Sequence, residues 1–213
     1  MLLPRNARDA GFTLIEVMAA SIILGTAVLA VGLLITKMTT GSVSSKDVSS
    51  AAVLLSEKLE DLNRWDSDDP QICVPGNAVS VGSLTSDITQ TTTCPGGAST
   101  SVNYFDDVYP NLSNGASTCP SGSAGCFAET VSSVAGTSTM YTTTFHSPDG
   151  IVQSTTANSP PAGITFHRRW VIESNPTING NSVTGVRRVT VLVTLKDATV
   201  QPAVSFQMSM VRP

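Results

Sequence analysis

One carboxylate, Glu16, lies inside an apolar run near the N-terminus, in the stretch RDAGFTLIEVMAASIILG (residues 8–25). An ionisable group inside a membrane segment costs about 2.5 to 3.5 kcal/mol near the bilayer centre, and by default it marks a function with a specific partner. Glu16 lies near one end of the run, which lowers this cost without removing it. We therefore expect the carboxylate to have a functional role.

The four cysteines form no CxxC pair and have no nearby histidine to complete a zinc site, so we expect no metal and no cofactor. If the body of the chain lies outside the cytoplasm, two disulfides are their natural use. Pairing Cys73 with Cys94 and Cys119 with Cys126 is the simplest of the possible connectivities. The sequence does not choose among them.

Other residues that could do chemistry are few. The two histidines, His146 and His167, stand in no context that suggests catalysis. His167 alternates with the apolar positions of a predicted strand, so we expect it to face solvent. Asp66, Asp68 and Asp69 resemble calcium ligands, but their spacing lacks the ligand set of a known calcium loop, and a solvated helix end is favoured. We therefore expect a protein that is not an enzyme.

Composition narrows the function classes further. The chain has 213 residues, of which 41% are hydrophobic and 13% charged, with a net charge of −4. This is enough for one domain with a core, and it lacks the clustered Lys and Arg of a nucleic-acid binder. Ser, Thr, Gly, Asn and Val dominate the middle and the C-terminal half, which favours a β-rich body.

The apolar run is long enough to span a membrane. No charged residue occurs from Val17 to Thr36, and a helix of about 20 residues crosses a hydrocarbon core of about 30 Å. Arg5 and Arg8 precede the run, so the N-terminus should stay in the cytoplasm. A secretory signal peptide has a shorter apolar middle of about 7 to 15 residues. A plain uncleaved anchor explains the length but not Glu16.

The stretch GFTLIEVMAASIILG resembles the class III signal sequence of type IV prepilins and of the pseudopilins of type II secretion. In that family a short charged leader ends in Gly, prepilin peptidase cuts after it, and the new N-terminal residue, usually Phe, is N-methylated. The resemblance implies cleavage between Gly11 and Phe12 and methylation of Phe12. It also implies a partner for Glu16, namely the Phe12 amine of a neighbouring subunit in the filament.

The rest of the chain predicts a helix on a sheet. AAVLLSEKLEDLNRW predicts an amphipathic helix, with its charged residues, Lys58 among them, largely on the polar side. Its apolar face comprises Val48, Ala51, Ala52, Leu55, Leu59 and Leu62. ITFHRRWVIE, VRRVTVLVTLKD and AVSFQMSMV carry apolar residues at every second position, which predicts an antiparallel sheet with one buried face. In the first strand these residues are Ile164, Phe166, Trp170 and Ile172.

The expected class is α+β, because the helix needs a surface and the sheet needs a cover. The resemblance implies the type IV pilin fold, a long N-terminal helix with a transmembrane half and an amphipathic half, packed on an antiparallel β-sheet. The expected segments are a leader (1–11), a transmembrane helix (12–37), its amphipathic continuation (38–66), a Cys-containing variable region of loops and short strands (67–163) and the sheet (164–213). VNYFDDVY, residues 102–109, is favoured as a satellite core over an exposed contact surface.

The segment LLSEKLEDL is similar to a helix of minor pilins of the PilV modification type. The leading expectation is a minor pilin that supports type IV pilus assembly, adhesion or motility. A type II secretion pseudopilin is the alternative, and a membrane-anchored periplasmic enzyme is the alternative from another class. The implied partners are prepilin peptidase, other pilin subunits, the inner-membrane assembly platform and membrane lipid, without nucleic acid. The implied location is the inner membrane, with the C-terminal domain in the periplasm, and after assembly the pilus on the cell surface.

Overall fold

The computed structural model describes residues 13–76, 78–95, 97, 99–112, 126–135, 137–146, 152–161, 163, 165–196 and 204–213. The chain divides into two compact units, residues 1–43 and 44–213. One helix, α1 (Leu14–Arg64), begins in the first unit and ends in the second.

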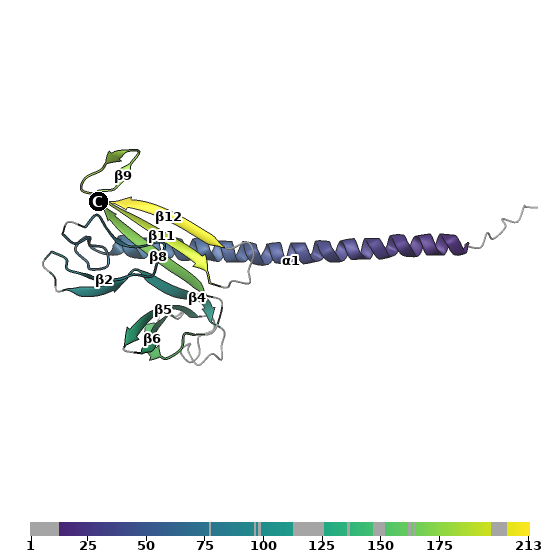
Figure 1. Cartoon of the computed structure of the whole chain (residues 1–213), viewed down its shortest axis with the longest axis horizontal. Helices are drawn as coiled ribbons and strands as arrows, with labels where there is room; N and C mark the ends of the chain where they lie inside the picture. The colour runs from purple at the N-terminus through teal and green to yellow at the C-terminus, as the bar shows by residue number, and fades with distance from the viewer. Residues whose placement is uncertain are drawn as a thin grey trace, which may run out of the picture. The chain divides into compact units, whose positions relative to one another are not determined.

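The second unit is built around one large β-sheet. Its strands are β1 (Ser80–Gly82), β2 (Thr89–Thr92), β3 (Thr100–Asn103), β4 (Phe105–Leu112), β5 (Cys126–Ala135), β6 (Ser138–His146), β7 (Val152–Ala157), β8 (Phe166–Ser174), β9 (Thr177–Ile178), β10 (Asn181–Ser182), β11 (Arg187–Leu195) and β12 (Ser205–Arg212). The main sheet has the order β12-β11-β8-β4-β5-β6-β7, of which Figure 1 labels the strands from β12 to β6. In addition, β1 pairs with β8. The strand pairs in it are antiparallel, so the expected α+β class is confirmed.

The sheet is larger than the three strands expected from the C-terminal third. Those three are β8, β11 and β12, with Trp170 opposite Val191 and Val193 opposite Phe206. The region expected to hold loops and short strands adds β4 to β7, of which β5 has 10 residues and β6 has 9. Threonine is β-branched and favours strands, so STMYTTTFH forms a strand without a long apolar run.

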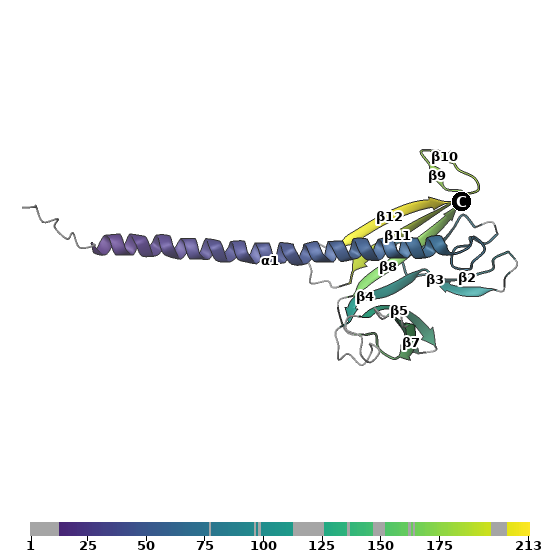
Figure 2. The ribbon, with the colours of Figure 1, turned by 180° about the vertical axis from the view of Figure 1, so that it is seen from behind.

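The core lies between the C-terminal part of α1 and one face of the sheet. Figure 2 shows this part of the helix in front of β8 and β11. One hydrophobic cluster contains Leu54, Leu55, Leu59 and Leu62 of the helix together with Phe166, Trp170, Ile172, Val189, Val191 and Val193 of the sheet. Fully burying one such side chain contributes about 1.5 to 3 kcal/mol, so this contact is the main source of stability of the unit. Ile164, expected on the same face, lies outside the described residues.

The buried face of α1 differs in part from the expected one. It comprises Ala51, Leu54, Leu55, Lys58, Leu59 and Leu62, whereas Val48 is exposed. Lys58 was expected on the polar side, and this is wrong, because it is only 8% exposed. It lies three residues after Leu55 and four before Leu62, so the helical period places it within the apolar stripe.

The segment 102–109 belongs to the core. Val102, Tyr104 and Val108 are part of the main hydrophobic cluster, together with the helix leucines. Tyr109 belongs to a second, smaller cluster with Ala128 and Phe145. The segment therefore joins the two clusters and presents few apolar groups to solvent.

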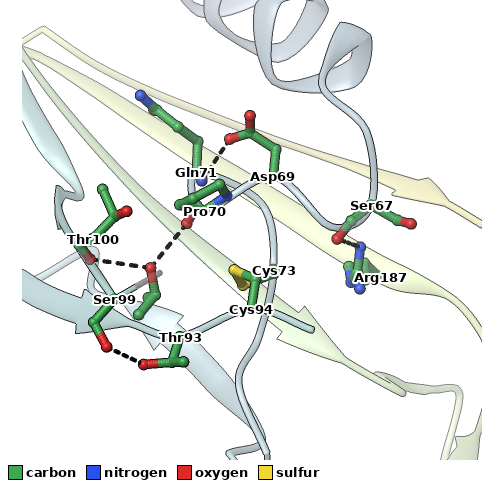
Figure 3. The surroundings of a disulfide bond; sticks show 11 residues. Ser67, Asp69, Pro70, Gln71, Cys73, Thr93, Cys94, Ser99, Thr100 and Arg187 are labelled. Carbon is green, nitrogen blue, oxygen red and sulfur yellow. Dashed lines mark hydrogen bonds between the residues drawn. A yellow bond between two sulfur atoms is a disulfide. The ribbon is translucent and has the colours of Figure 1, made fainter. Parts of the chain in front are cut away.

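A disulfide between Cys73 and Cys94 joins the segment after α1 to the segment after β2, with a Cα–Cα distance of 6.0 Å (Figure 3). Nearby, the Thr92 hydroxyl donates to the Pro70 carbonyl at 3.2 Å. Closing a loop of about 20 residues stabilises a fold by about 3 kcal/mol in the chain-entropy account. Cys126 begins β5, and Cys119 lies outside the described residues.

The three aspartates after α1 form part of a turn. The Asp66 carboxylate accepts the Ser67 backbone N–H at 2.6 Å. The Asp69 carboxylate accepts the Gln71 backbone N–H at 2.8 Å, which Figure 3 shows. Such local hydrogen bonds are typical of Asp in turns. Two of the three carboxylates are thus engaged in shaping the exit from the helix.

Candidate functional site

The first turn of α1 contains Glu16 in a reciprocal contact with Thr13. The Thr13 N–H donates to Glu16 Oε2 at 3.4 Å, and the Glu16 N–H donates to Thr13 Oγ1 at 3.4 Å. This is the arrangement of a capping box, in which the two side chains satisfy backbone donors that the helix leaves unpaired. The negative charge also lies at the positive end of the helix dipole.

This cap was missed at the sequence level, although a signal for it is present. Thr, two residues and then Glu directly before an apolar run is the capping-box pattern. The pattern gives Glu16 a role within its own chain. Gly11 and Phe12, the expected cleavage and methylation positions, lie outside the described residues.

The first unit presents an apolar helix surface. Ile22, Leu29 and Leu33 are 66 to 71% exposed, and α1 contains an 18-residue window of mean hydropathy 2.4 with none of it buried. By length and composition the helix can cross a membrane. Ser21 and Thr36 donate their hydroxyls to the helix carbonyls of Val17 and Gly32, at 2.7 and 3.0 Å, which hides their polarity from lipid.

In the second unit, a buried ion network joins the helix to the sheet. Arg168 on β8 is fully buried and binds Asp106 on β4 with two hydrogen bonds, each 2.7 Å long. Its guanidinium also contacts the Glu129 carboxylate on β5 and the Leu54 carbonyl of α1, the latter at 3.4 Å. Lys58 places its ammonium 3.4 Å from Asp106 and 4.2 Å from the centre of a Trp170 ring.

The charges in this network compensate for their burial. Burial alone would raise the pKa of Asp106, but the positive charges of Arg168 and Lys58 outweigh it and lower the pKa. Burial alone would lower the pKa of Arg168, but Asp106 and Glu129 outweigh it and raise the pKa. Asp106 and Arg168 are therefore both ionised at neutral pH, and the network fixes α1 against β4, β5 and β8.

Arg168 was not singled out from the sequence, although its position gives the signal. Phe166, Arg168 and Trp170 occupy alternate positions, and the burial pattern of β8 alternates through all three. A strand sends every second side chain to one face, so an arginine between two buried aromatic residues lies on the buried side. The paired acid could not be found this way, because β4 lies about sixty residues away in the chain.

A second charge cluster lies around His167. Its Nδ1 lies 2.7 Å from Asp107 Oδ1 on β4, and its Nε2 lies 2.8 Å from Asp87 Oδ1 in the segment between β1 and β2. The side chain is only 11% exposed, so the expectation that it faces solvent is wrong. The alternation correctly sends it away from the helix, but the segment that carries Asp87 contacts it there.

The comparisons with known proteins bear on the N-terminal segment. The prokaryotic N-terminal methylation motif matches residues 6–32. Comparison with curated proteins and with solved structures gives no match. The matched motif supports a type IV pilin-like prepilin, and the long N-terminal helix with a mostly antiparallel sheet is a type IV pilin-like arrangement.

More particularly, the motif supports a precursor of either a type IV pilin or a pseudopilin. It implies processing by prepilin peptidase and assembly with other pilins, and it points to a structural subunit in place of an enzyme. Together with the apolar helix it indicates a membrane-anchored pilin.

Proposed function

We propose that the chain is a minor pilin that prepilin peptidase cleaves between Gly11 and Phe12 and that is then methylated at Phe12 and incorporated into a type IV pilus or its tip. The observation that carries this proposal is the methylation motif at residues 6–32, which continues into an exposed apolar helix. The similarity of LLSEKLEDL to minor pilins of the PilV modification type favours the minor subunit. In the pilus, the protein would support assembly, adhesion or motility.

Before assembly, the expected location is the inner membrane, with residues 44–213 in the periplasm. Arg5 and Arg8 precede the apolar helix, and positive residues stay on the cytoplasmic side. The disulfide between Cys73 and Cys94 fits an oxidising compartment such as the periplasm. Assembly would then require the inner-membrane platform and would leave the protein in the pilus on the cell surface.

Glu16 would direct incorporation by exchanging one partner for another. Its contacts with Thr13 are 3.4 to 3.5 Å long, whereas charge-assisted hydrogen bonds are typically about 2.7 to 2.9 Å. Little free energy is therefore lost when the carboxylate leaves its cap. Pairing with the Phe12 amine of a neighbouring subunit would cancel two charges that are expensive in lipid and would fix the axial register of the helices.

Two substitutions separate the charge of Glu16 from its capping role. Glu16→Gln keeps a residue that suits a capping box but removes the charge, and Glu16→Ala removes both. We expect both variants to be cleaved but to be depleted from sheared filaments to a similar extent. Glu60→Gln, at an exposed carboxylate of the same helix, is the control. Normal recovery of Glu16→Gln in filaments would contradict the docking role.

The second candidate, a pseudopilin of type II secretion, rests on the same motif. It predicts that the full-length protein copurifies with components of a secretion system and that its loss abolishes export of a secreted enzyme. A minor pilin predicts copurification with a major pilin and loss of surface filaments. Pull-down from membranes followed by mass spectrometry distinguishes the two.

A further inference from the structure

We propose that His167 is a proton-dependent latch, which fastens the segment between β1 and β2 to the main sheet through Asp87 and Asp107. The segment spans residues 83–88 and leads into the β2–β3 hairpin. The latch segment, as we name these six residues, carries Asp87. Asp107 belongs to β4, so the imidazole joins two parts of the chain that are 20 residues apart.

The geometry requires a doubly protonated imidazole. Both ring nitrogens lie within 2.8 Å of a carboxylate oxygen, and an ionised carboxylate only accepts hydrogen bonds. A neutral imidazole has one N–H and one lone pair, so it can donate to one of the two carboxylates and faces the other with a lone pair. The bridge from Asp87 to Asp107 therefore exists only in the charged form of His167.

Each carboxylate also has a cation of its own. Arg169 Nε on β8 lies 2.7 Å from Asp87 Oδ1, and Lys196 Nζ after β11 lies 2.7 Å from Asp107 Oδ2. The centre of the Phe105 ring on β4 lies 6.2 Å from the centre of the imidazole ring. The cluster thus holds three positive and two negative charges when His167 is charged. Loss of the His167 proton leaves both aspartates ionised, because Arg169 and Lys196 remain.

Deprotonation of His167 affects only the latch segment and the β2–β3 hairpin that follows it. The latch segment ends at Ile88, whose carbonyl accepts the Tyr104 N–H at 2.9 Å, and the Gln90 side chain accepts the Gly82 N–H at 2.9 Å. At its other end β2 is followed by Cys94, which the disulfide ties to Cys73. The hairpin is therefore held covalently at one end. At the other end Asp87 keeps its contact with Arg169, and the charged His167 adds a second contact, so loss of the His167 proton weakens this end while the main sheet persists.

The electrostatic shifts have the sign that the latch requires. Burial alone would lower the pKa of His167, but the carboxylates of Asp107 and Asp87 outweigh it and raise the pKa above its ordinary value. The contribution of His167 is thus complete below about pH 6.5 and is lost as the pH rises through its raised pKa. Burial alone would raise the pKa of Asp87 and of Asp107. Arg169 and His167 outweigh it and lower the pKa of Asp87, and His167 and Lys196 do the same for Asp107. Their contribution is complete above about pH 4 and is lost as the pH falls through the lowered pKa values.

The test is a pH titration of the full-length protein in detergent micelles. The chain has two histidines, so imidazole ¹³C NMR gives two titration curves, which His146→Gln assigns. We expect His167 to titrate above the ordinary histidine value of about 6.5 and Asp87→Asn to lower its pKa. Amide hydrogen exchange at Tyr104 and Gly82 should lose protection across the same pH range, while the β11 amides keep theirs.

Asp68→Asn, at an exposed aspartate outside the cluster, is the matched control and should leave the His167 pKa unchanged. His167→Gln should show the loosened hairpin at every pH. If that variant does not fold, the Asp87→Asn titration decides. A His167 pKa at or below its ordinary value, or unchanged protection at Tyr104 and Gly82 across the titration, would overturn the latch.

Discussion

At the residue scale, Asp106 is the carboxylate that two buried cations share. Arg168 makes two hydrogen bonds to it, and the Lys58 ammonium lies 3.4 Å away. The three residues come from three elements, β4, β8 and α1. A buried pair of this kind contributes less through net attraction than through the penalty that arises when one partner is removed. Asp106 is thus a point at which one substitution should affect the whole second unit.

We predict that Asp106→Asn destabilises residues 44–213 by about 3 to 5 kcal/mol, because it removes the carboxylate that the buried Lys58 and Arg168 share and leaves Glu129 as the acid in contact with Arg168. Urea unfolding of the full-length protein in micelles, followed by tryptophan fluorescence, measures the change. Asp68→Asn removes an exposed charge and should change the stability by less than about 0.5 kcal/mol. Equal free energies of unfolding of the two variants would show that the network does not contribute to stability.

At the element scale, the regular patterns in the sequence predict most of the fold. Leu55, Leu59 and Leu62 follow the helical period, and the alternation of β8 and β11 places their apolar residues on one face, as found. The alternation of β12 is followed only in part, because Met208 is 45% exposed. Two of the errors concern charged residues. Lys58 was placed by its charge instead of its position in the period, and His167 was assumed to lie in water because the acid that covers it is distant in sequence.

The candidate sites also differ in whether their interacting residues are close in the sequence. The cap of Glu16 uses a residue three positions away, so the sequence contains it, whereas the partners of Arg168 and His167 come from strands that only the fold brings together. The long strand β6 was missed because its residues are mainly Ser and Thr, and β5 was missed because its apolar residues do not fall at every second position. Local patterns could be predicted, and contacts between distant segments could not.

The pairing of β1 with β8 depends on Gly82. It has a φ of +82°, and an added Cβ would collide with the Trp170 carbonyl oxygen and the Tyr104 ring. We predict that Gly82→Ala destabilises the second unit by more than the roughly 1 to 3 kcal/mol of backbone strain alone. Gly180→Ala is the matched control, since Gly180 has a φ of +81° with no atom within 4 Å of the added Cβ. Urea unfolding of both variants gives the difference, and equal losses would show that β1 can move away from β8.

At the scale of the whole molecule, the two units differ in the features they contain. Residues 1–43 hold the methylation motif and an exposed apolar helix, which support a membrane-anchored pilin precursor. Residues 44–213 hold a sheet, a disulfide and two charge clusters that fix its elements. Processing should therefore depend on the first unit, and the surface that a filament presents should depend on the second.

We propose above all that prepilin peptidase cleaves the chain after Gly11. Mass spectrometry of the protein from membranes of cells with active prepilin peptidase tests it most directly. We predict a mature chain of 202 residues, the 213 of the sequence minus the 11 of the leader, that begins at Phe12 and carries one methyl group on its α-amine. In cells without the peptidase, the leader should remain. A chain that keeps residues 1–11 in the presence of the active peptidase would contradict the claim.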